Sequence, residues 1–205
     1  MYGKKPNKVK VRVTKSLLDS WLYSYRKEDG YEDFLRTLNR EKTPPTQAML
    51  DGTAYENMLN NILNGEPLYQ DNKYFYVLCE MAYELQGSAQ QVVLFKDPEV
   101  DGVPTLLHGV LDYLIASHIY DCKFSKTYHL NKYLWEYTSQ TGMYLALVPE
   151  AVDFTYIITD GNYVYRERYP RDIVPPIEDT IKQFYKFLNQ HDLWNIFLEK
   201  WRVNN

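Results

Sequence analysis

The stretch Gly109-Val-Leu-Asp112-Tyr-Leu-Ile-Ala-Ser-His-Ile-Tyr-Asp121-Cys-Lys123 decides the fold of this chain. Two apolar segments flank a short polar one, a pattern that predicts the two strands of a hairpin. Side chains two positions apart in a strand point to the same face, so Asp121 and Lys123 project together and Cys122 points away. A tight turn also places Asp112 across from Asp121. The stretch therefore predicts two carboxylates and one ammonium group together at the end of a small sheet.

A group of this kind has the chemistry to bind a hard divalent cation and to direct a water molecule at a phosphate. An Asp-x-Lys sequence at a strand end is also common as a pair of solvated charges, because Asp and Lys side chains are mostly exposed. The choice between these two interpretations depends on one motif before the hairpin and one motif after it.

The first motif is Gly52-Thr-Ala-Tyr-Glu56, in a segment (45–63) whose apolar spacing predicts a helix. Gly52 and Glu56 lie one turn apart and share a face of this helix. A glycine there allows a sheet or a substrate backbone to approach, and the glutamate can reach the same cation as the hairpin acids. The alternative is that Glu56 is an ordinary exposed residue of an amphipathic helix.

The second motif is Gln140-Thr-Gly-Met-Tyr144, in a segment (131–148) that also predicts a helix. Gln140 and Tyr144 are again one turn apart, so they share a face. An amide and a phenol can donate hydrogen bonds to a phosphate or to a nucleic-acid backbone. The alternative is helix packing, with Tyr144 in the core and Gln140 at its edge.

The other apolar patterns complete an alternating series of helices and strands. Helices are expected at 14–25, 31–38 and 73–85, and a helical region that breaks near His191 is expected at 175–205. Strands are expected at 90–96, 105–116, 119–124, 152–159 and 163–168. The charged segment 27–43 is interpreted as an insertion or lid that borders the site.

The order of these motifs resembles that of the PD-(D/E)xK nuclease superfamily, and within it the RecB-like and phage (lambda-type) exonuclease branch. The resemblance covers roughly residues 14–160. It implies an α/β fold of the restriction-endonuclease-like type, with a mixed central β-sheet flanked by helices on both faces.

The resemblance also implies a role for each motif residue. Glu56, Asp112, Asp121 and the backbone carbonyl of Cys122 correspond to metal ligands. Lys123 corresponds to the lysine that orients the attacking water or stabilises the charged phosphate. The positions of Gln140 and Tyr144 match the motif typical of the RecB-like branch, so both are counted with the catalytic set.

The donor atoms of this set favour particular metals. Three carboxylates and a carbonyl favour Mg²⁺ or Mn²⁺ over softer ions. Several relatives carry an iron–sulfur cluster, which requires four thiolates. This chain has two cysteines, Cys79 and Cys122, so no iron–sulfur cluster is expected within one chain.

Length and charge set the wider frame. A chain of 205 residues is expected to form a single domain with a substantial core. Its net charge is −4, but residues 1–27 carry eight basic residues against one acidic residue, which leaves −11 for the remainder. Residues 1–13 are therefore expected to be a basic arm that binds phosphate in a salt-dependent manner, or else a solubilising tail.

The expected function is metal-dependent hydrolysis of DNA phosphodiester bonds. The resemblance favours a phage or mobile-element exonuclease in recombination or repair, with DNA as substrate and a single-strand annealing or recombination protein as a possible partner. The alternatives are a structure-specific or restriction-like endonuclease, a non-catalytic RecB-like module that binds DNA or a partner, and a phosphoesterase of small molecules. Homo-oligomers are compatible with each alternative.

The cellular location is expected to be cytoplasmic. Two well-separated cysteines give no disulfide framework, which suits a reducing compartment. The N-terminal residues are charged, with no apolar core typical of a signal peptide. No apolar run approaches the ~20 residues that a membrane span needs.

Overall fold

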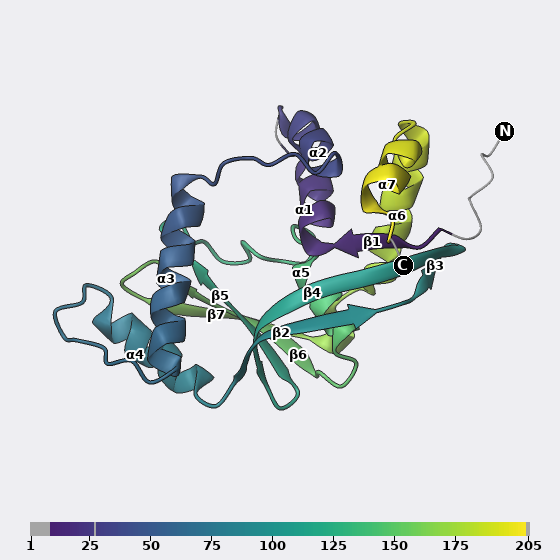
Figure 1. The fold of residues 1–205 in the computed structure, drawn as a ribbon. Coiled ribbons are helices and arrows are strands. Elements are labelled where there is room, and N and C mark those ends of the chain that lie inside the picture. Colours follow the sequence, from purple (N-terminus) through teal and green to yellow (C-terminus); the bar gives the residue numbers. More distant parts are fainter. Residues whose placement is uncertain (1–8, 27, 204–205) are drawn as a thin grey trace.

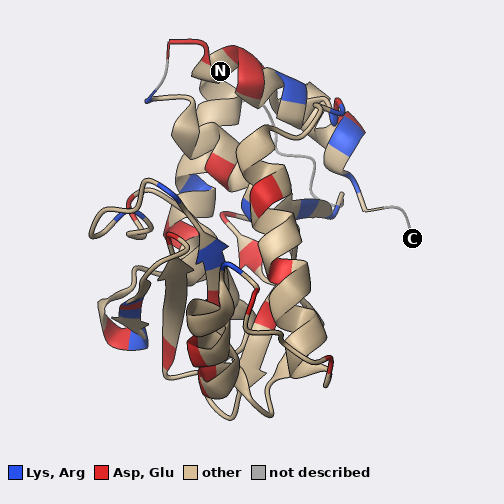
Figure 2. Cartoon of the chain, turned by 90° about the vertical axis from the view of Figure 1, so that its left-hand side faces the viewer, with Lys and Arg blue, Asp and Glu red and all other residues tan. Residues whose placement is uncertain are grey.

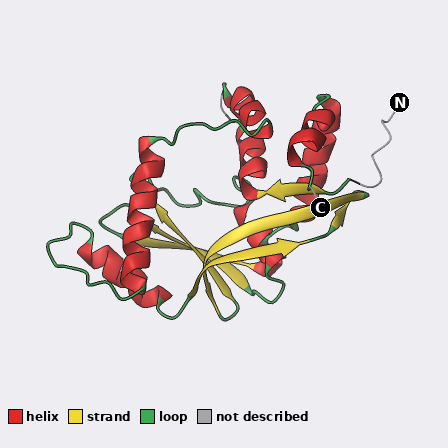
Figure 3. Cartoon of the chain, viewed as in Figure 1, coloured by secondary structure: helices red, strands yellow, loops and turns green. Residues whose placement is uncertain are grey.

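The computed structural model describes residues 9–26 and 28–203. In this part of the chain, seven strands form one mixed sheet (Figures 1 and 3). The strands are β1 (Val11–Thr14), β2 (Ala89–Lys96), β3 (Glu99–Val100), β4 (Val103–Ile115), β5 (His118–Phe124), β6 (Asp153–Thr159) and β7 (Val164–Pro170). Pairing is parallel for β1 with β4 and for β5 with β6, and antiparallel for the other pairs.

Helices cover both faces of this sheet. The helices are α1 (Lys15–Tyr23), α2 (Gly30–Leu38), α3 (Gln47–Leu63), α4 (Phe75–Leu85), α5 (Gln140–Leu147), α6 (Ile177–Gln190) and α7 (Trp194–Trp201), with a short 3-10 helix at Arg171–Ile173. The larger core contains buried residues of α1, α2, α5, α6 and α7, and the smaller core contains those of α3 and α4. Figure 1 shows α3 and α4 on one side of the sheet, away from α6 and α7. The predicted fold class, a mixed central sheet with helices on both faces, is confirmed.

The long strand β4 organises the site because its two edges are used differently. Leu107 pairs with both β1 and β2, and Tyr113 pairs with both β5 and β2. Strands β1 and β5 therefore share the edge of β4 that lies opposite β2. On this edge the last β4 residue paired with β1 is His108, and the first β4 residue paired with β5 is Tyr113, so residues 109–112 have no strand partner there.

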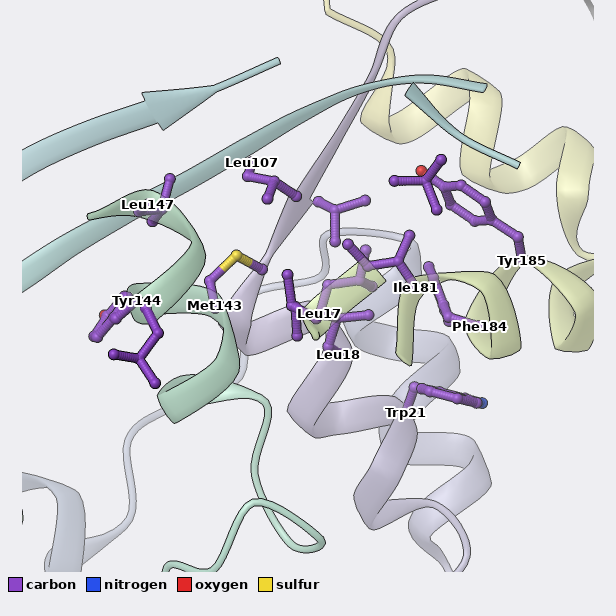
Figure 4. Packing of buried hydrophobic residues seen from close by; sticks show 14 of the residues in the cluster. Leu17, Leu18, Trp21, Leu107, Met143, Tyr144, Leu147, Ile181, Phe184 and Tyr185 are labelled. Atoms are coloured by element: carbon purple, nitrogen blue, oxygen red, sulfur yellow. The ribbon is translucent and has the colours of Figure 1, made fainter. Parts of the chain in front are cut away.

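Helix α5 closes the resulting gap between β4 and β5. The Tyr144 hydroxyl donates a hydrogen bond of 2.8 Å to the backbone carbonyl of Val110, within the unpaired stretch. Gly109 makes the close approach possible, because a Cβ atom there would lie 2.7 Å from Tyr144 and 2.8 Å from Leu147. Figure 4 shows Tyr144 and Leu147 on α5 beside β4. Asp112 lies between Val110 and Tyr113, at the end of the gap where the pairing of β4 with β5 begins.

Three local predictions require correction. The helix predicted at 131–148 begins only at Gln140, with turns before it. Within the predicted basic arm, Val11 and Val13 are fully buried in a strand, while residues 1–8 lie outside the described part. The segment interpreted as a lid contains α2, whose Phe34 and Leu38 are fully buried, so this helix belongs to the core.

The C-terminal region contains two helices, as expected. Helix α6 ends at Gln190 and α7 begins at Trp194, so the break falls at the predicted position near His191. Among the helices of the described residues, none is both long and apolar enough to cross a membrane.

Candidate active site

The centre of the candidate site is Asp121 on β5. This residue is 1% exposed, and both of its carboxylate oxygens face a partner. Lys123 forms an ion pair with Oδ1, and the side-chain amide of Gln140 donates a hydrogen bond to Oδ2. The hairpin motif and the Gln140 motif predicted from the sequence therefore meet in space at one buried carboxylate.

Asp112 lies across the hairpin from Asp121, as predicted. Tyr113 pairs with Tyr120 in the ladder, so the next positions outward are Asp112 and Asp121. Burial, together with the neighbouring Asp121 carboxylate, raises the pKa of Asp112 to about 8. The two acids are thus close enough for each to disfavour the ionisation of the other.

Lys123 carries the compensating positive charge. Burial alone would lower its pKa, but the carboxylates of Asp121 and Asp112 outweigh this effect and raise the pKa above its usual value. The ammonium group therefore stays charged at physiological pH. A fixed cation at this point can stabilise negative charge that develops on a bound phosphate.

Glu56 reaches the same region from α3. Burial and the nearby Asp121 carboxylate raise its pKa, while Lys123 acts in the opposite direction. Its Oε1 atom accepts a hydrogen bond of 3.3 Å from the side chain of Gln91 on β2. The three acids proposed from the motifs thus lie within electrostatic range of one another, although they come from three different elements.

Gln91 is a site residue that sequence reasoning missed. Its φ angle is +50°, in the left-handed region that non-glycine residues rarely adopt. The ladder between β2 and β4 pairs Gln90 with Tyr113 and Val92 with Leu111, so Gln91 lies opposite Asp112. The sequence of β2, with Gln90 and Gln91 before the apolar run 92–95, gives no local sign of this role, because both the backbone angle and the contact depend on the folded structure.

The side chain and the backbone carbonyl of Cys122 face different parts of the structure. The thiol is buried in the smaller core with Tyr55 and Tyr113, and burial and the Asp121 charge raise its pKa. The N–H group of Ser125, just after β5, donates a hydrogen bond of 2.8 Å to the carbonyl of Thr159 at the end of β6. The backbone N–H and C=O groups of odd-numbered residues along β5 therefore point toward β6. Since backbone directions alternate along a strand, the Cys122 carbonyl faces the other edge, toward the gap beside β4.

The structure adds detail to two of the predicted positions, Tyr144 and Gly52. The Tyr144 hydroxyl binds the backbone of Val110, so its expected contact with a phosphate stays a prediction. Gly52 has no neighbouring atom within 4 Å of an added Cβ, so no sheet approaches the helix there. Of the sheet and the substrate backbone that were expected to approach Gly52, the open space is compatible with the substrate backbone.

The donor atoms fit a hard divalent cation in chemistry. Asp121 Oδ1 is buried beside the ammonium group of Lys123, with which it forms an ion pair, and burial together with the neighbouring acids raises the pKa values of Asp112 and Glu56. A cation offsets this repulsion. In residues 9–26 and 28–203, no three His, Cys, Asp or Glu side chains are already grouped as ligands of one ion. Ligation by all three acids therefore needs side-chain movement on binding.

Two solved structures share this fold. The structure of SSO0001 has a TM-score of 0.52 and 17% sequence identity, over 92% of this chain and 77% of SSO0001. The structure of LHK-Exo in complex with dAMP has a TM-score of 0.53 and 15% identity, over 90% of each chain. No protein-family model matches this chain, and no curated protein matches it in sequence. At these identities the likeness shows the fold.

Proposed function

We propose that this protein is a metal-dependent DNA nuclease that hydrolyses phosphodiester bonds. The observation that carries the proposal is the convergence of Glu56, Asp112, Asp121, Lys123 and Gln140 beside the gap between β4 and β5. The shared fold with LHK-Exo, which was solved with a nucleotide, supports the same reading.

Each residue has a role in this proposal. Glu56, Asp112, Asp121 and the Cys122 carbonyl would hold Mg²⁺ or Mn²⁺, which lowers the pKa of a bound water and neutralises phosphate charge. Gln140 keeps the Asp121 carboxylate in place through its hydrogen bond, so the orientation of this ligand does not depend on the metal alone. Lys123 places a fixed positive charge where the phosphate gains negative charge in the transition state.

The finer assignment rests on the sequence resemblance. The lambda-type branch favours an exonuclease of phage or mobile-element recombination and repair, with a single-strand annealing or recombination protein as partner. A structure-specific endonuclease would use the same residues, so the products of cleavage must distinguish the two. A module that binds DNA without cutting it would retain binding and lack metal-dependent products.

The test is cleavage of end-labelled linear duplex, circular duplex and single-stranded DNA with Mn²⁺, Mg²⁺ or EDTA. Loss of linear DNA alone, in the presence of metal, supports the exonuclease, whereas nicked or linearised circles identify an endonuclease. Asp121→Asn should reduce the rate at least about 100-fold, since it removes a charge that acts directly on the reaction.

The matched control is Asp179→Asn, which removes an exposed acid on α6 that pairs with Lys182. This variant should cleave like the wild type. Equal loss of activity in Asp121→Asn and Asp179→Asn would contradict a site at β5. Absence of cleavage on every substrate, with DNA retained in a mobility-shift assay, would favour the binding module.

A further inference from the structure

A cavity of about 470 Å³ lies next to the candidate site, between the first half of α3 and the segment that precedes α4. Cavities of roughly 300–1,000 Å³ are typical of sites for small organic ligands. Its lining includes Asp51 and Met58 of α3, Lys73 and Tyr74 before α4, and Lys126 after β5. None of these residues belongs to the acid and lysine cluster described above.

Three aromatic rings connect this cavity to the candidate site. Tyr55 stacks on Phe124 with ring centroids 5.0 Å apart, and Tyr74 meets both rings edge-on at 5.4 and 5.5 Å. Tyr55 precedes Glu56 in sequence, and Phe124 follows Lys123. Of these three rings, Tyr74 lines the cavity itself. The packed rings thus join the cavity wall to the segments of α3 and β5 that carry Glu56 and Lys123.

The lining combines one aromatic ring, that of Tyr74, with the two cations Lys73 and Lys126. The ammonium group of Lys73 lies 4.6 Å from the centre of the Tyr74 ring, and that of Lys126 lies 5.9 Å from the centre of the Phe124 ring. Tyr74 itself is held by a hydrogen bond of 2.9 Å from its N–H to the Asn72 side chain. A lining that offers one aromatic ring and two ammonium groups suits a ligand with a flat ring and an anionic group.

The charges also show what has to be displaced when an anion binds. Lys126 forms an ion pair of 2.7 Å with Asp51, whose other oxygen accepts a hydrogen bond of 2.8 Å from Gln47. An anion in the cavity would compete with Asp51 for Lys126. Figure 2 shows Lys and Arg positions lying among Asp and Glu positions on this side of the molecule.

We propose that this cavity binds one nucleoside monophosphate unit, with the phosphate held by Lys73 and Lys126 and the nucleoside against Tyr74 and Met58. The inference rests on the proposed nuclease function, because a nucleotide unit beside the cleaved bond is what such an enzyme would have to grip. The same chemistry is offered by a free nucleotide and by a nucleotide within a single strand, and the experiment separates these two sources.

The experiment measures binding of fluorescein-labelled octathymidylate by anisotropy, in EDTA so that no cleavage occurs. Lys73→Ala and Lys126→Ala should each weaken binding about three- to tenfold, as expected for loss of a charge-assisted contact. Each should also reduce the slope of log K against log salt by about 0.7. Asp51→Asn should strengthen binding, because it frees Lys126 from its internal partner.

The matched controls remove a comparable ion pair elsewhere. Lys182 and Asp179 on α6 are exposed and lie 2.9 Å apart, so Lys182→Ala and Asp179→Asn should leave binding unchanged. The five cavity and control positions whose charge is removed are exposed or half-buried, and folding is checked by circular dichroism for every variant. Lys126→Ala that binds like wild type, or Asp51→Asn that binds more weakly, would overturn the proposal.

Competition experiments distinguish a site for a free nucleotide from a site for a nucleotide within a single strand. Displacement of the labelled strand by dTMP supports a site for free nucleotides, and displacement by unlabelled octathymidylate alone supports a unit within a strand. Equal competition by inorganic phosphate and dTMP would overturn the nucleoside contact with Tyr74. The nuclease function is judged separately: cleavage in Mn²⁺ with no effect of Lys73→Ala and Lys126→Ala contradicts the cavity alone, and binding that follows the predictions without cleavage contradicts the nuclease alone.

Discussion

Gln140 on α5 donates a hydrogen bond from its side-chain amide to Asp121 on β5, and both side chains are buried. The same carboxylate is paired with Lys123. Helix α5 therefore contributes twice to the region: Gln140 holds the central acid, and Tyr144, one turn later, supports the neighbouring strand at Val110. Two residues of one motif thus act on the two strands that separate at the candidate site.

The first prediction concerns Tyr144→Phe. The substitution removes the donor to the Val110 carbonyl and keeps the ring in place. A buried acceptor left without a partner costs about 1–3 kcal/mol, so the free energy of unfolding should fall by that amount. Chemical denaturation measures the change. The control is Tyr76→Phe, at a position that is 85% exposed, where a change within about 0.5 kcal/mol is expected. Equal stabilities of the two variants would show that the Val110 carbonyl is solvated.

The second prediction compares two glycines. Gly109→Ala places a Cβ against Tyr144 and Leu147 at 2.7 and 2.8 Å, and such overpacking costs about 1–3 kcal/mol. Gly52→Ala meets no atom within 4 Å inside a helix and should stabilise the protein by about 0.5–1 kcal/mol. Thermal unfolding should therefore shift in opposite directions. A stabilising Gly109→Ala would contradict the close packing of α5 on β4.

Much of the fold follows from sequence patterns, and the exceptions share one cause. The start of α5 was predicted nine residues too early because the aromatic residues before it, among them Trp135, resemble a helical face. In the structure Trp135 packs on Tyr169, and Ser139 donates both its N–H and its hydroxyl to Asp19 at 2.6 and 2.8 Å. Helix α5 thus begins directly after Ser139, whose backbone and side chain donate hydrogen bonds to Asp19 of α1. No local sequence pattern reveals this contact.

The candidate site divides in the same way. Asp112, Asp121 and Lys123 were brought together by strand alternation and a short hairpin, which are local rules. Gln91 was missed because its position opposite Asp112 follows from the pairing of β2 with β4 and from a left-handed backbone. Strand β1 was missed for a similar reason, since its four residues are stabilised by parallel pairing with a strand about 90 positions away.

The third prediction tests whether Gln91 positions Glu56. Gln91→Gly relieves the left-handed strain and removes the amide, whereas Gln91→Asn keeps an amide on a shorter side chain. Relief of strain should stabilise Gln91→Gly or leave it unchanged, yet its metal-dependent cleavage should fall about tenfold under the proposed function. The decisive readout is the apparent affinity for Mn²⁺, which should weaken in the same variant. Unchanged Mn²⁺ affinity would indicate that Gln91 serves the strand alone.

The fourth prediction concerns Lys123→Met, which removes the charge and keeps much of the side-chain volume. Asp121 and Asp112 then lose their cation, and an uncompensated buried charge costs about 3–5 kcal/mol. Mn²⁺ should restore part of this stability by replacing the charge, while cleavage stays at least about 100-fold below wild type. Thermal unfolding with and without Mn²⁺ measures the first effect. Lys200→Met, at a half-buried position on α7, is the control and should change neither quantity.

The fifth prediction is a pH dependence of stability without metal. The pKa of Asp112 is raised to about 8 in the folded protein, whereas an unfolded aspartate titrates near 4. Between these values the folded state binds the proton more tightly than the unfolded state does. The contribution of Asp112 is therefore most favourable below about pH 4 and is lost as the pH rises toward 8, with a slope of at most about 1.4 kcal/mol per pH unit.

Denaturation in EDTA from pH 5 to 8 should show this slope in the wild type, and Asp112→Asn should remove most of it. The difference between the two proteins matters, because other groups titrate equally in both. Saturating Mn²⁺ should flatten the wild-type curve at the upper end of the range, since a bound cation favours the ionised carboxylate. A wild-type curve parallel to that of Asp112→Asn in EDTA would show that solvent or a neighbouring group already stabilises the charged acid.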